Sequence, residues 1–303
     1  MTTTNSAADL TQCAGADRWD AHTIARVAWS TIVHPGNEAV GRLIEERGAV
    51  GALDAVLDNV ARADSLRPSI STADAKRALT RSVTEILHRS EVAGYQIISP
   101  AHPMWPHQVD AMGDAAPLLL WTLGDVGLLN SSMVVVSGTR SISARGLHTA
   151  LDLASGVADQ GHTIVAGGEP GIETVAHRAA IAMTGRTVAL VATGLDRINT
   201  AGVVGRVARI GAVISEVPPG VRVRSRSVRR RNEVLGALGH RTLIVEAGLG
   251  SESLIVASSA AQLGRCVGAV PSGGADRRSG GCDYLLAAGI ARPVRTVSDA
   301  VRW

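Results

Sequence analysis

The residues best suited to chemistry follow a short apolar run, Met133 to Val136, where the chain turns through Ser137-Gly138-Thr139-Arg140. Beyond the turn, apolar residues recur at the spacing of one helical face, at Leu147, Leu151, Ala154 and Ala158. This pattern predicts a buried strand, a tight glycine turn and a helix. Backbone N–H groups and a helix N-terminus favour an anion at such a turn, and a guanidinium can bind phosphate through two parallel hydrogen bonds. We therefore expect a phosphate-binding turn that includes Arg140.

A second cationic group is a run of arginines near residue 225, in a chain whose only lysine is Lys76. Three of these arginines alternate and three are consecutive: Arg222, Arg224 and Arg226, then Arg229, Arg230 and Arg231. In an extended segment the alternating set would point to one side. Guanidinium groups at this density are typical of a path for nucleic-acid phosphates. A solvated surface loop is the alternative, and we favour the phosphate path.

Several acidic side chains also stand at positions where chemistry is conceivable. Glu173 and His177 are four residues apart and would share one helical face, as a general acid/base pair could. Glu216 and Glu246 follow apolar runs and are expected to accept hydrogen bonds from nearby N–H groups or arginines. We favour a structural role for the Glu173–His177 pair and predict no catalytic residue.

The elements that must position these residues form a repeating series. Apolar strands are expected to begin near Met133, Thr163, Thr187, Ala212, Thr242 and Cys266. Most of them follow a glycine that ends a helical pattern, namely Gly161, Gly185, Gly211 and Gly264, which is the signature of a βαβ series. The fold class is therefore α/β, an extended Rossmann-like and mostly parallel sheet with helices on both faces. Ligands of such sheets bind at the carboxyl ends of the strands.

The segments expected at those carboxyl ends are rich in glycine, serine and arginine. Flexible glycine loops let an anionic backbone approach main-chain N–H groups. The candidate phosphate- and nucleic-acid-binding residues from this rim are Ser137, Gly138, Thr139, Arg140, Gly167, Gly168, Gly171, Arg224, Arg226, Arg229, Arg230 and Arg231.

The sequence before the sheet divides into three parts. Residues 1–18 are small and polar and are expected to be a disordered tail, and residues 19–92 carry helical periodicity typical of a small all-helical domain. Its turn His34-Pro35-Gly36-Asn37 is compatible with a helix-hairpin-helix module or with a plain helical bundle, which we favour. Residues 93–303 form the Rossmann domain, opening with a proline-rich connector that we expect to be extended, with one short strand near Leu118 to Trp121.

Composition limits the classes of protein that remain. The 303 residues carry a formal net charge of +3, and no apolar run reaches the length of a membrane span or a signal peptide. We expect a cytoplasmic protein with no membrane contact. Cys13, Cys266 and Cys282 are expected to be free thiols and match no metal-ligand spacing. Neither a G-x-G-x-x-G fingerprint nor a Walker motif follows the first strand, so we predict no cofactor and no metal.

Eight motifs, taken together and in order, resemble the DNA-processing protein A (DprA/Smf) family. They are Ser137-Gly138-Thr139-Arg140 with Gly146, Gly171-Ile172-Glu173-Thr174-Val175-Ala176-His177, Gly194-Leu195-Asp196, Ile214-Ser215-Glu216, Arg231-Asn232, Val245-Glu246-Ala247, Ser251 to Leu254, and Val270-Pro271. The resemblance implies an extended Rossmann fold and single-stranded DNA binding in a basic pocket that includes Asn232. It also implies a homodimer that helps to load a RecA-type recombinase during natural transformation. We expect a divergent member without the C-terminal winged helix of some relatives.

The sequence departs from the family pattern by adding acids near the expected phosphate site. Glu169, Glu233 and Glu252 stand where the family has neutral or basic residues, and Val228 replaces a phenylalanine. A second class of function therefore stays open: a phosphoribohydrolase-like enzyme that processes nucleotides on the same rim, with Glu169, Glu173 or Glu246 as the acid/base. The arginine run favours the DNA-binding function, because a mononucleotide pocket does not need it.

Overall fold

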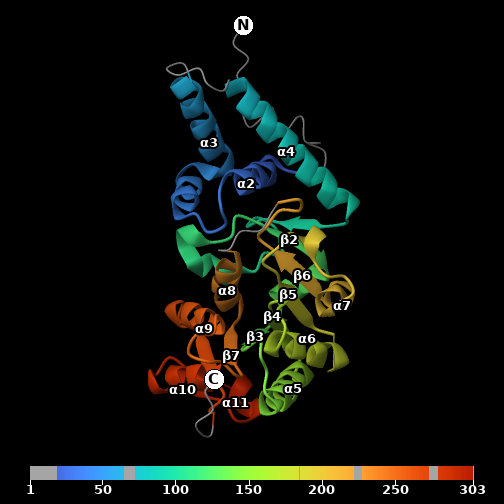
Figure 1. Ribbon diagram of the computed structural model, residues 1–303. Coiled ribbons are helices and arrows are strands. Elements are labelled where there is room, and N and C mark those ends of the chain that lie inside the picture. The colour runs from blue at the N-terminus through green and yellow to red at the C-terminus, as the bar shows by residue number, and fades with distance from the viewer. Residues whose placement is uncertain (1–18, 65–71, 184, 222–226, 273–278, 303) are drawn as a thin grey trace.

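The computed structural model describes residues 19–64, 72–183, 185–221, 227–272 and 279–302. The expected tail at residues 1–18 therefore lies outside the described residues. Three helices stand at one end of an elongated molecule: α2 (Ala21–Ile32), α3 (Glu38–Asp64) and α4 (Thr72–Val92) (Figure 1). The N-cap Asp20 starts α2 by accepting a hydrogen bond from the N–H of Thr23, and Gly48 kinks α3 with a φ of 71°.

The described residues form one nine-stranded sheet with the order β1-β2-β6-β5-β4-β3-β7-β8-β9. Its strands are β1 (Gln96–Ile98), β2 (Leu120–Gly124), β3 (Met133–Ser137), β4 (Thr163–Ala166), β5 (Thr187–Leu190), β6 (Ala212–Ser215), β7 (Arg241–Ile244), β8 (Cys266–Ala269) and β9 (Arg292–Pro293). Pairing is parallel from β6 through to β9, and antiparallel at β1 and β2. The predicted mostly parallel α/β sheet and all six of its expected strands are confirmed.

The connector differs from the expectation of a single short strand. It contributes two strands, β1 and β2, which pair with each other, and β2 also pairs with β6. Trp121 of β2 is fully buried by this pairing. The unexpected strand is β1, which is ordered by its antiparallel pairing with β2, and the sequence does not reveal it because a strand of three residues has little pattern to read.

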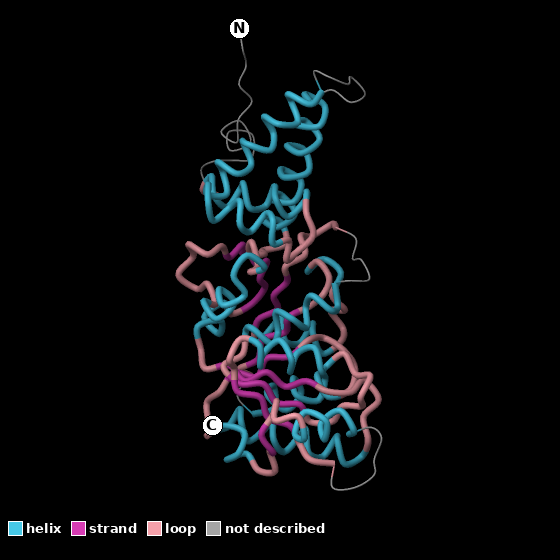
Figure 2. Tube along the Cα trace, turned by 90° about the vertical axis from the view of Figure 1, so that its left-hand side faces the viewer, coloured by secondary structure: helices cyan, strands magenta, loops and turns pink. Residues whose placement is uncertain are grey.

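Helices cover both faces of the sheet, as Figure 2 shows from the side. Their bounds are α5 (Ala144–Asp159), α6 (Ile172–Met183), α7 (Val203–Ile210), α8 (Ser227–Leu238), α9 (Ser253–Gln262), α10 (Gly280–Ala287) and α11 (Val297–Val301), with short 3-10 turns η1 (His107–Ala115), η2 (Val126–Asn130) and η3 (Leu195–Arg197). Within the described ranges, none of the helices combines the length and apolar composition that a membrane span requires.

The side chains of β3 point alternately to the two faces of the sheet, and each face is covered by its own layer of helices. Val134 and Val136 pack with α5, α6 and α11, whereas Val135 lies in a separate apolar cluster with α8 and α9. Because successive side chains of a strand point to opposite faces, one apolar run can anchor helices on both sides. The turn at the end of β3 is thereby held between two helical layers.

The N-terminal helices are packed against the sheet end formed by β2, β5 and β6. One apolar cluster contains Ile24 and Leu53 from the helices together with Trp121 and Val213 from the strands. In addition, Nη1 of Arg26 donates to the carbonyl oxygen of Leu118 at 3.0 Å. This packing fixes the turn between α2 and α3 beside the carboxyl ends of β5 and β6, where it borders a pocket.

Candidate nucleic-acid interface

The crossover direction of the chain reverses at β3, because β4 lies on one side of this strand and β7 on the other. Open α/β sheets bind ligands at such a switch point, outside the carboxyl ends of the strands. A cleft of about 520 Å³ lies there. It is lined by the turn after β3, the loop after β4, the start of α8 and the loop after β7, with the residues Ser137, Gly138, Thr139, Arg140, Ser141, Glu169, Glu173, Arg231, Asn232, Gly248, Gly250, Ser251, Glu252 and Ser253.

The turn after β3 is closely packed and needs its glycines. A β-carbon at Gly138 would lie 2.6 Å from Cγ1 of Ile172, and Gly171 adopts a φ of +89° against the backbone of Thr139 and Arg140. The N–H of Thr139 donates to the carbonyl oxygen of Glu246 at 2.6 Å. That N–H group is therefore committed to the fold, and the donors that an anion would meet at this turn include the Arg140 guanidinium and the hydroxyls nearby.

Arg140 lies on the rim of the cleft, and its guanidinium is close to the carboxylates of Glu169 and Glu252. Its side chain is 57% exposed, and its Nε lies 3.2 Å from Oε2 of Glu169. Its Nη2 lies 3.7 Å from Oε2 of Glu252. Both acids are departures from the family pattern, so the added carboxylates lie against the expected phosphate ligand.

Arg231 is the second guanidinium of the cleft, and it is buried. Its side chain is 4% exposed, and its Nη1 lies 2.9 Å from Oε2 of Glu173, whose side chain is 6% exposed. The other oxygen of Glu173 accepts a hydrogen bond from the hydroxyl of Ser137 at 2.9 Å, and Oε2 also accepts from the N–H of Glu169 at 3.2 Å. A side chain at Gly167 would collide with Arg231. This network joins the end of β3 and the loop after β4 to α8.

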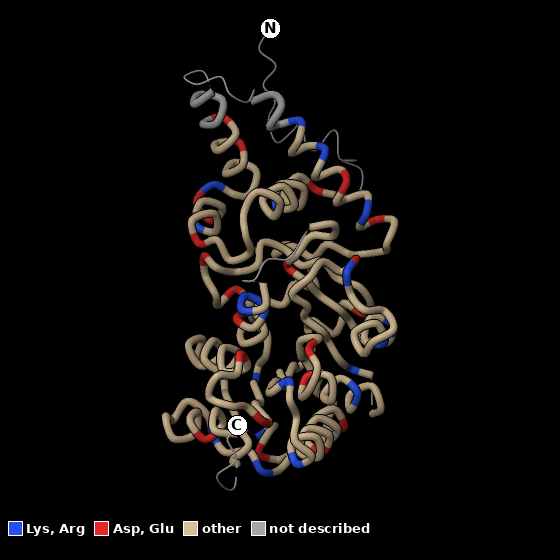
Figure 3. The backbone as a smooth tube through the Cα atoms, in the orientation of Figure 1, with Lys and Arg blue, Asp and Glu red and all other residues tan. Residues whose placement is uncertain are grey.

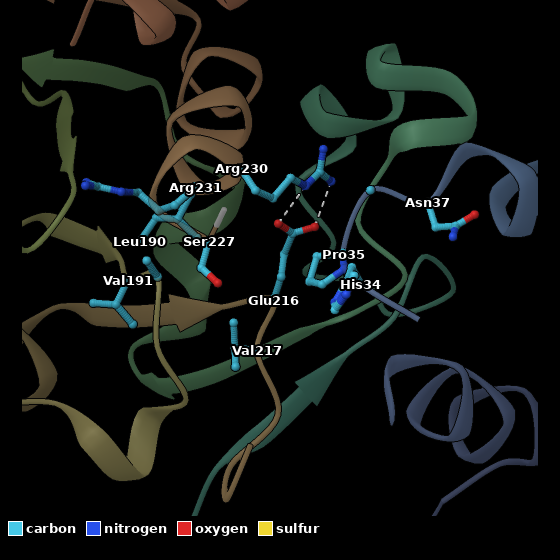
Figure 4. A pocket seen from close by; sticks show the side chains of 12 residues that line it. His34, Pro35, Asn37, Leu190, Val191, Glu216, Val217, Ser227, Arg230 and Arg231 are labelled. Carbon is cyan, nitrogen blue, oxygen red and sulfur yellow. Dashed lines mark hydrogen bonds and ion pairs between the residues drawn. The ribbon is translucent and has the colours of Figure 1, made fainter. Parts of the chain in front are cut away.

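The remaining described arginines of the run lie on α8 and radiate in different directions, because successive helical residues point about 100° apart. Arg229 is 69% exposed and pairs with Glu233, Nε to Oε1 at 3.2 Å. Arg230 is largely buried, and its Nε and Nη2 donate to the two oxygens of Glu216 at 3.0 and 2.8 Å (Figure 4). Arg222, Arg224 and Arg226 lie outside the described residues.

The formal charge of the described cleft lining is −1, from Arg140 and Arg231 against Glu169, Glu173 and Glu252. Figure 3 shows that basic and acidic residues lie close together along the backbone around α8. Any polyanion that enters this cleft must therefore compete with carboxylates of the protein itself.

The other acids expected to accept hydrogen bonds do so. Glu216 accepts from Arg230, as described above, and Oε2 of Glu246 accepts from the N–H of Ser143 at 3.0 Å, at the start of α5. Glu246 also lies against Gly146, where a β-carbon would meet its carboxylate. The prediction for both glutamates is confirmed.

Glu173 and His177 occupy one face of α6, as predicted, but their partners are structural. His177 is fully buried, with Nε2 2.7 Å from the carbonyl oxygen of Gly167 and Nδ1 2.8 Å from Oγ1 of Thr187. Burial lowers the pKa of the His177 imidazole below its usual value. These contacts hold α6 against the loop after β4 and fit the structural role that we favoured.

Sequence reasoning missed two features of this rim. Ser141 joins the cleft lining, where its N–H donates to Oγ1 of Thr139 at 3.2 Å. The turn His34-Pro35-Gly36-Asn37 lies against Arg230, since a β-carbon at Gly36 would be 2.8 Å from Cζ of that arginine. Nothing in the local pattern signals the second contact, because almost two hundred residues separate its partners.

Comparison with known proteins places this geometry in a family. Residues 96–302 match the family described as DNA recombination-mediator protein A. The putative DNA processing protein DprA of Mycobacterium tuberculosis (strain H37Rv) is 33% identical over 293 residues, which is 91% of this chain and 74% of that protein. The DNA processing protein DprA of Streptococcus pneumoniae is 33% identical over 177 residues, 57% of this chain and 62% of the relative.

Two solved structures share the fold. The X-ray structure of DprA from S. pneumoniae superposes with a TM-score of 0.72 at 25% identity, covering 93% of this chain and 96% of that one. A structure of DprA from Helicobacter pylori, described for its single-stranded DNA binding mode, gives a TM-score of 0.62 at 25% identity and covers 69% of this chain and 94% of its own. The resemblance seen in the sequence is thereby confirmed, and the chain belongs to the DNA recombination-mediator protein A family.

Proposed function

We propose that this protein binds single-stranded DNA without catalysing a reaction on it, and loads a RecA-type recombinase on the bound strand during DNA uptake by natural transformation. The observation that carries the proposal is the cleft at the switch point of the sheet, with the exposed Arg140 on its rim beside glycine and serine loops. Family membership and the described single-stranded DNA binding of the H. pylori relative support it.

In this proposal the residues of the rim divide into two roles. Arg140 and Arg229 are exposed and can exchange their carboxylate partners for phosphate oxygens, as can the hydroxyls of Thr139 and Ser251. Arg230 and Arg231 are largely buried and hold the loops in place from α8. Of the other predicted ligands, Ser137, Gly138 and Asn232 line the cleft, Ser137 and Asn232 as buried residues. In the proposal Gly167, Gly168 and Gly171 shape the loop after β4, and Arg224 and Arg226 extend the electrostatic path.

The proposal includes a homodimer and a separate N-terminal unit. We propose residues 19–92 as the small helical domain and 93–303 as the DNA-binding domain. Light scattering at several protein concentrations tests the dimer. Expression of 93–303 alone tests the boundary, which is wrong if that fragment does not fold, because the apolar cluster of the helices continues into the sheet.

The nucleotide-processing alternative has less support from the geometry. A general acid/base residue must lie within hydrogen-bond reach of the substrate, with a lone pair or a proton that no protein partner already uses. Glu173 is held by Ser137 and Arg231, and Glu246 serves the start of α5. Glu169 lines the cleft, but its two oxygens are paired with Arg140 and Arg231, at 3.2 and 3.7 Å.

The test combines binding and loading. Fluorescence anisotropy with a labelled oligo-dT measures affinity, with a duplex of equal length as competitor and base release from nucleoside monophosphates assayed in parallel. Loading is read from the ATPase activity of a RecA recombinase on DNA coated with single-strand binding protein. We expect tight binding of oligo-dT, weaker binding of duplex, stimulation of the ATPase and no base release. Base release without oligo-dT binding would instead establish the enzyme.

A further inference from the structure

Arg230 lies in the first turn of α8 and contacts three segments that are far apart in the sequence. Its Nε and Nη2 donate to the two carboxylate oxygens of Glu216, which follows β6, at 3.0 and 2.8 Å (Figure 4). Its Nη2 also donates to the carbonyl oxygen of Ala115, the last residue of η1, at 2.7 Å. A β-carbon at Gly36 would lie 2.8 Å from Cζ of Arg230, so the guanidinium lies against the turn 34–37 between α2 and α3. Arg230 therefore connects α8 to the N-terminal helices.

The environment of Arg230 does not suit a phosphate ligand. The side chains of Arg230 and Glu216 are 11% and 8% exposed, so their charges compensate each other away from solvent. A phosphate would have to replace a buried carboxylate that already accepts from two nitrogens of the guanidinium. Arg230 can therefore act on bound DNA through the residues that it holds, without touching the strand.

Arg231, the next residue of α8, belongs to the DNA cleft. Figure 4 shows the side chains of Arg230 and Arg231 leaving the helix in opposite directions. Nη1 of Arg231 lies 2.9 Å from Oε2 of Glu173, whose other oxygen accepts from Ser137 at the end of β3. Residues of one helical turn are joined by the hydrogen-bonded backbone, so a shift of Arg230 that moves the start of α8 also moves Arg231. The first turn of α8 thus links the N-terminal helices to the lining of the cleft.

The packing on one side of the turn 34–37 is incomplete. A pocket of about 310 Å³ lies between this turn, the ends of β5 and β6 and the start of α8. Dense packing normally fixes neighbouring elements against one another, and a cavity leaves the side chains that line it without partners on that side. The hydrogen bonds of Arg230 therefore contribute more than usual to the position of α8 relative to the turn.

The contact of Arg230 with η1 leads back to the same N-terminal helices. Nε of Arg42, on α3, lies 3.1 Å from Oδ2 of Asp114, and a β-carbon at Gly41 would collide with the carbonyl group of Asp114. Because Ala115 follows Asp114 directly, α3 fixes the carbonyl oxygen to which Arg230 donates. The N-terminal helices thus reach Arg230 by two routes, the turn 34–37 and η1.

We propose that Arg230 is a positioning residue through which the N-terminal helices set the affinity of the cleft for single-stranded DNA. Its contacts with the turn 34–37, Ala115 and Glu216 fix the start of α8, and α8 in turn presents Arg231 and Asn232 to the cleft. The inference rests on the proposed binding of single-stranded DNA and gives the N-terminal helices a part in it.

The salt dependence of binding distinguishes a positioning residue from a phosphate ligand. Each phosphate that a side chain neutralises contributes about −0.7 to the slope of log K against log salt. In anisotropy titrations with oligo-dT, Arg230→Met should weaken binding about five- to ten-fold and leave the slope unchanged. Arg140→Ala, which removes a proposed phosphate ligand, should flatten the slope by about 0.7. Arg230→Lys should bind nearly as weakly as Arg230→Met, because an ammonium keeps the charge and loses the paired donors.

A double variant separates positioning from stability alone. Arg230→Met leaves the carboxylate of Glu216 buried without its partner and should lower the urea midpoint. Combining it with Glu216→Leu removes both charges and should recover most of the midpoint, while the binding of oligo-dT stays weak. Wild-type affinity in the folded double variant would overturn the proposal, because Arg230 would then serve stability only. A slope flattened by about 0.7 in Arg230→Met would also overturn it, because Arg230 would then be a phosphate ligand.

The part played by the turn is tested from its own side. Gly36 has a φ of +76°, which asparagine tolerates better than most residues, and a β-carbon there would displace the guanidinium of Arg230. Gly36→Asn should therefore weaken the binding of oligo-dT without changing the slope. Gly94→Asn is the matched control, because Gly94 has a φ of +71° and no atom lies within 4 Å of its β-carbon position. This control should bind as wild type.

The remaining outcomes each decide one point. Wild-type affinity in a folded Gly36→Asn would overturn the proposal, because the N-terminal helices would then not act through Arg230. If circular dichroism shows that Gly36→Asn does not fold, the double variant of Arg230 and Glu216 decides alone. No binding of oligo-dT by the wild-type protein would overturn the proposed function itself, and this inference with it.

Discussion

The Nε of Arg140 lies 3.2 Å from Oε2 of Glu169, so the guanidinium expected to bind phosphate is paired with an acid of its own chain. Glu252 approaches the same guanidinium from the opposite loop at 3.7 Å. Exposed ion pairs of this kind contribute little and can be exchanged for another anion. The carboxylates therefore outnumber the guanidinium groups in the described cleft lining, and under the proposed function the affinity for single-stranded DNA depends on a competition between carboxylates and phosphates.

Replacing Arg140 with alanine should weaken binding of oligo-dT by about ten-fold, because one charge-assisted hydrogen bond at a half-exposed position is lost. Arg140→Lys should recover part of the affinity, since a point charge keeps the attraction and loses the paired donors. Anisotropy titrations measure both. Arg209→Ala removes an exposed arginine in the last turn of α7, which precedes the amino end of β6 and lies away from the cleft, and serves as the control. Unchanged binding by a folded Arg140→Ala would remove the phosphate role from this turn.

Neutralising Glu169 and Glu252, the two acids that pair with Arg140, should strengthen the binding of oligo-dT. Glu169→Gln and Glu252→Gln each release Arg140 from a carboxylate, and each should tighten binding of oligo-dT by roughly two- to five-fold at low salt. The gain should shrink as salt is added, because both pairs are partly exposed and screened. Glu91→Gln, on the exposed end of α4, is a matched control for the loss of one negative charge. Weaker binding by the double variant would mean that the acids support the site.

The buried pair of Arg231 and Glu173 should matter for stability more than for binding. Glu173→Ala leaves the buried guanidinium of Arg231 with only the more distant carboxylate of Glu169, at 3.7 Å, and breaking a buried pair typically costs about 3–5 kcal/mol of unfolding free energy. Urea denaturation measures the loss. The double variant Glu173→Leu with Arg231→Met should recover much of it, since no charge is then buried alone. Arg140→Ala, by contrast, should leave the melting temperature nearly unchanged. Equal stability of Glu173→Ala and wild type would contradict the structural role of the pair.

The salt dependence of binding reports how many phosphates the arginine run neutralises. If the arginines neutralise about four phosphates of a single strand, the slope of log K against log salt should be near −3, since each phosphate contributes about −0.7. Neutralising Arg224, Arg226 and Arg229 together should flatten that slope by about 2 units, whatever the effect on affinity at one salt concentration. Titrations at four or more salt concentrations give the slope. If it does not change, the strand follows another path.

Stability should fall as the solution is acidified below about pH 6.5, the usual pKa of histidine. Burial lowers the pKa of His177 in the folded protein, so the unfolded chain takes up a proton first and unfolding becomes easier. Stability is complete above that pH and is lost as pH falls towards the folded-state pKa. His162 and His240 shift in the same direction and add to the effect. Urea midpoints between pH 8 and 5.5 measure it. A His177→Gln variant with an equally steep dependence would assign the effect to the other two histidines.

The sequence by itself determined the layers of the sheet and the segments that meet at its functional edge. Each of the six parallel strands expected from apolar runs exists, and the glycines at 161, 185 and 264 adopt the positive φ that ends a helix. Such features are local, because strand burial, turn geometry and helical spacing depend on residues close in the chain. The same local patterns indicate the turn carrying Arg140, the loop of Gly167 and the start of α8, without any information on their contacts.

Only the tertiary structure decided which charges pair and which surfaces adjoin. The sequence shows Arg140, Glu169 and Glu252 as separate features, and only the chain crossovers bring the loops of β3, β4 and β7 close enough for the three side chains to meet. The same holds for Gly36 and Arg230, which line one pocket although almost two hundred residues separate them in the sequence. Contacts between distant residues depend on topology and on how side chains fill the space between packed layers, and neither leaves a periodic signal in the sequence.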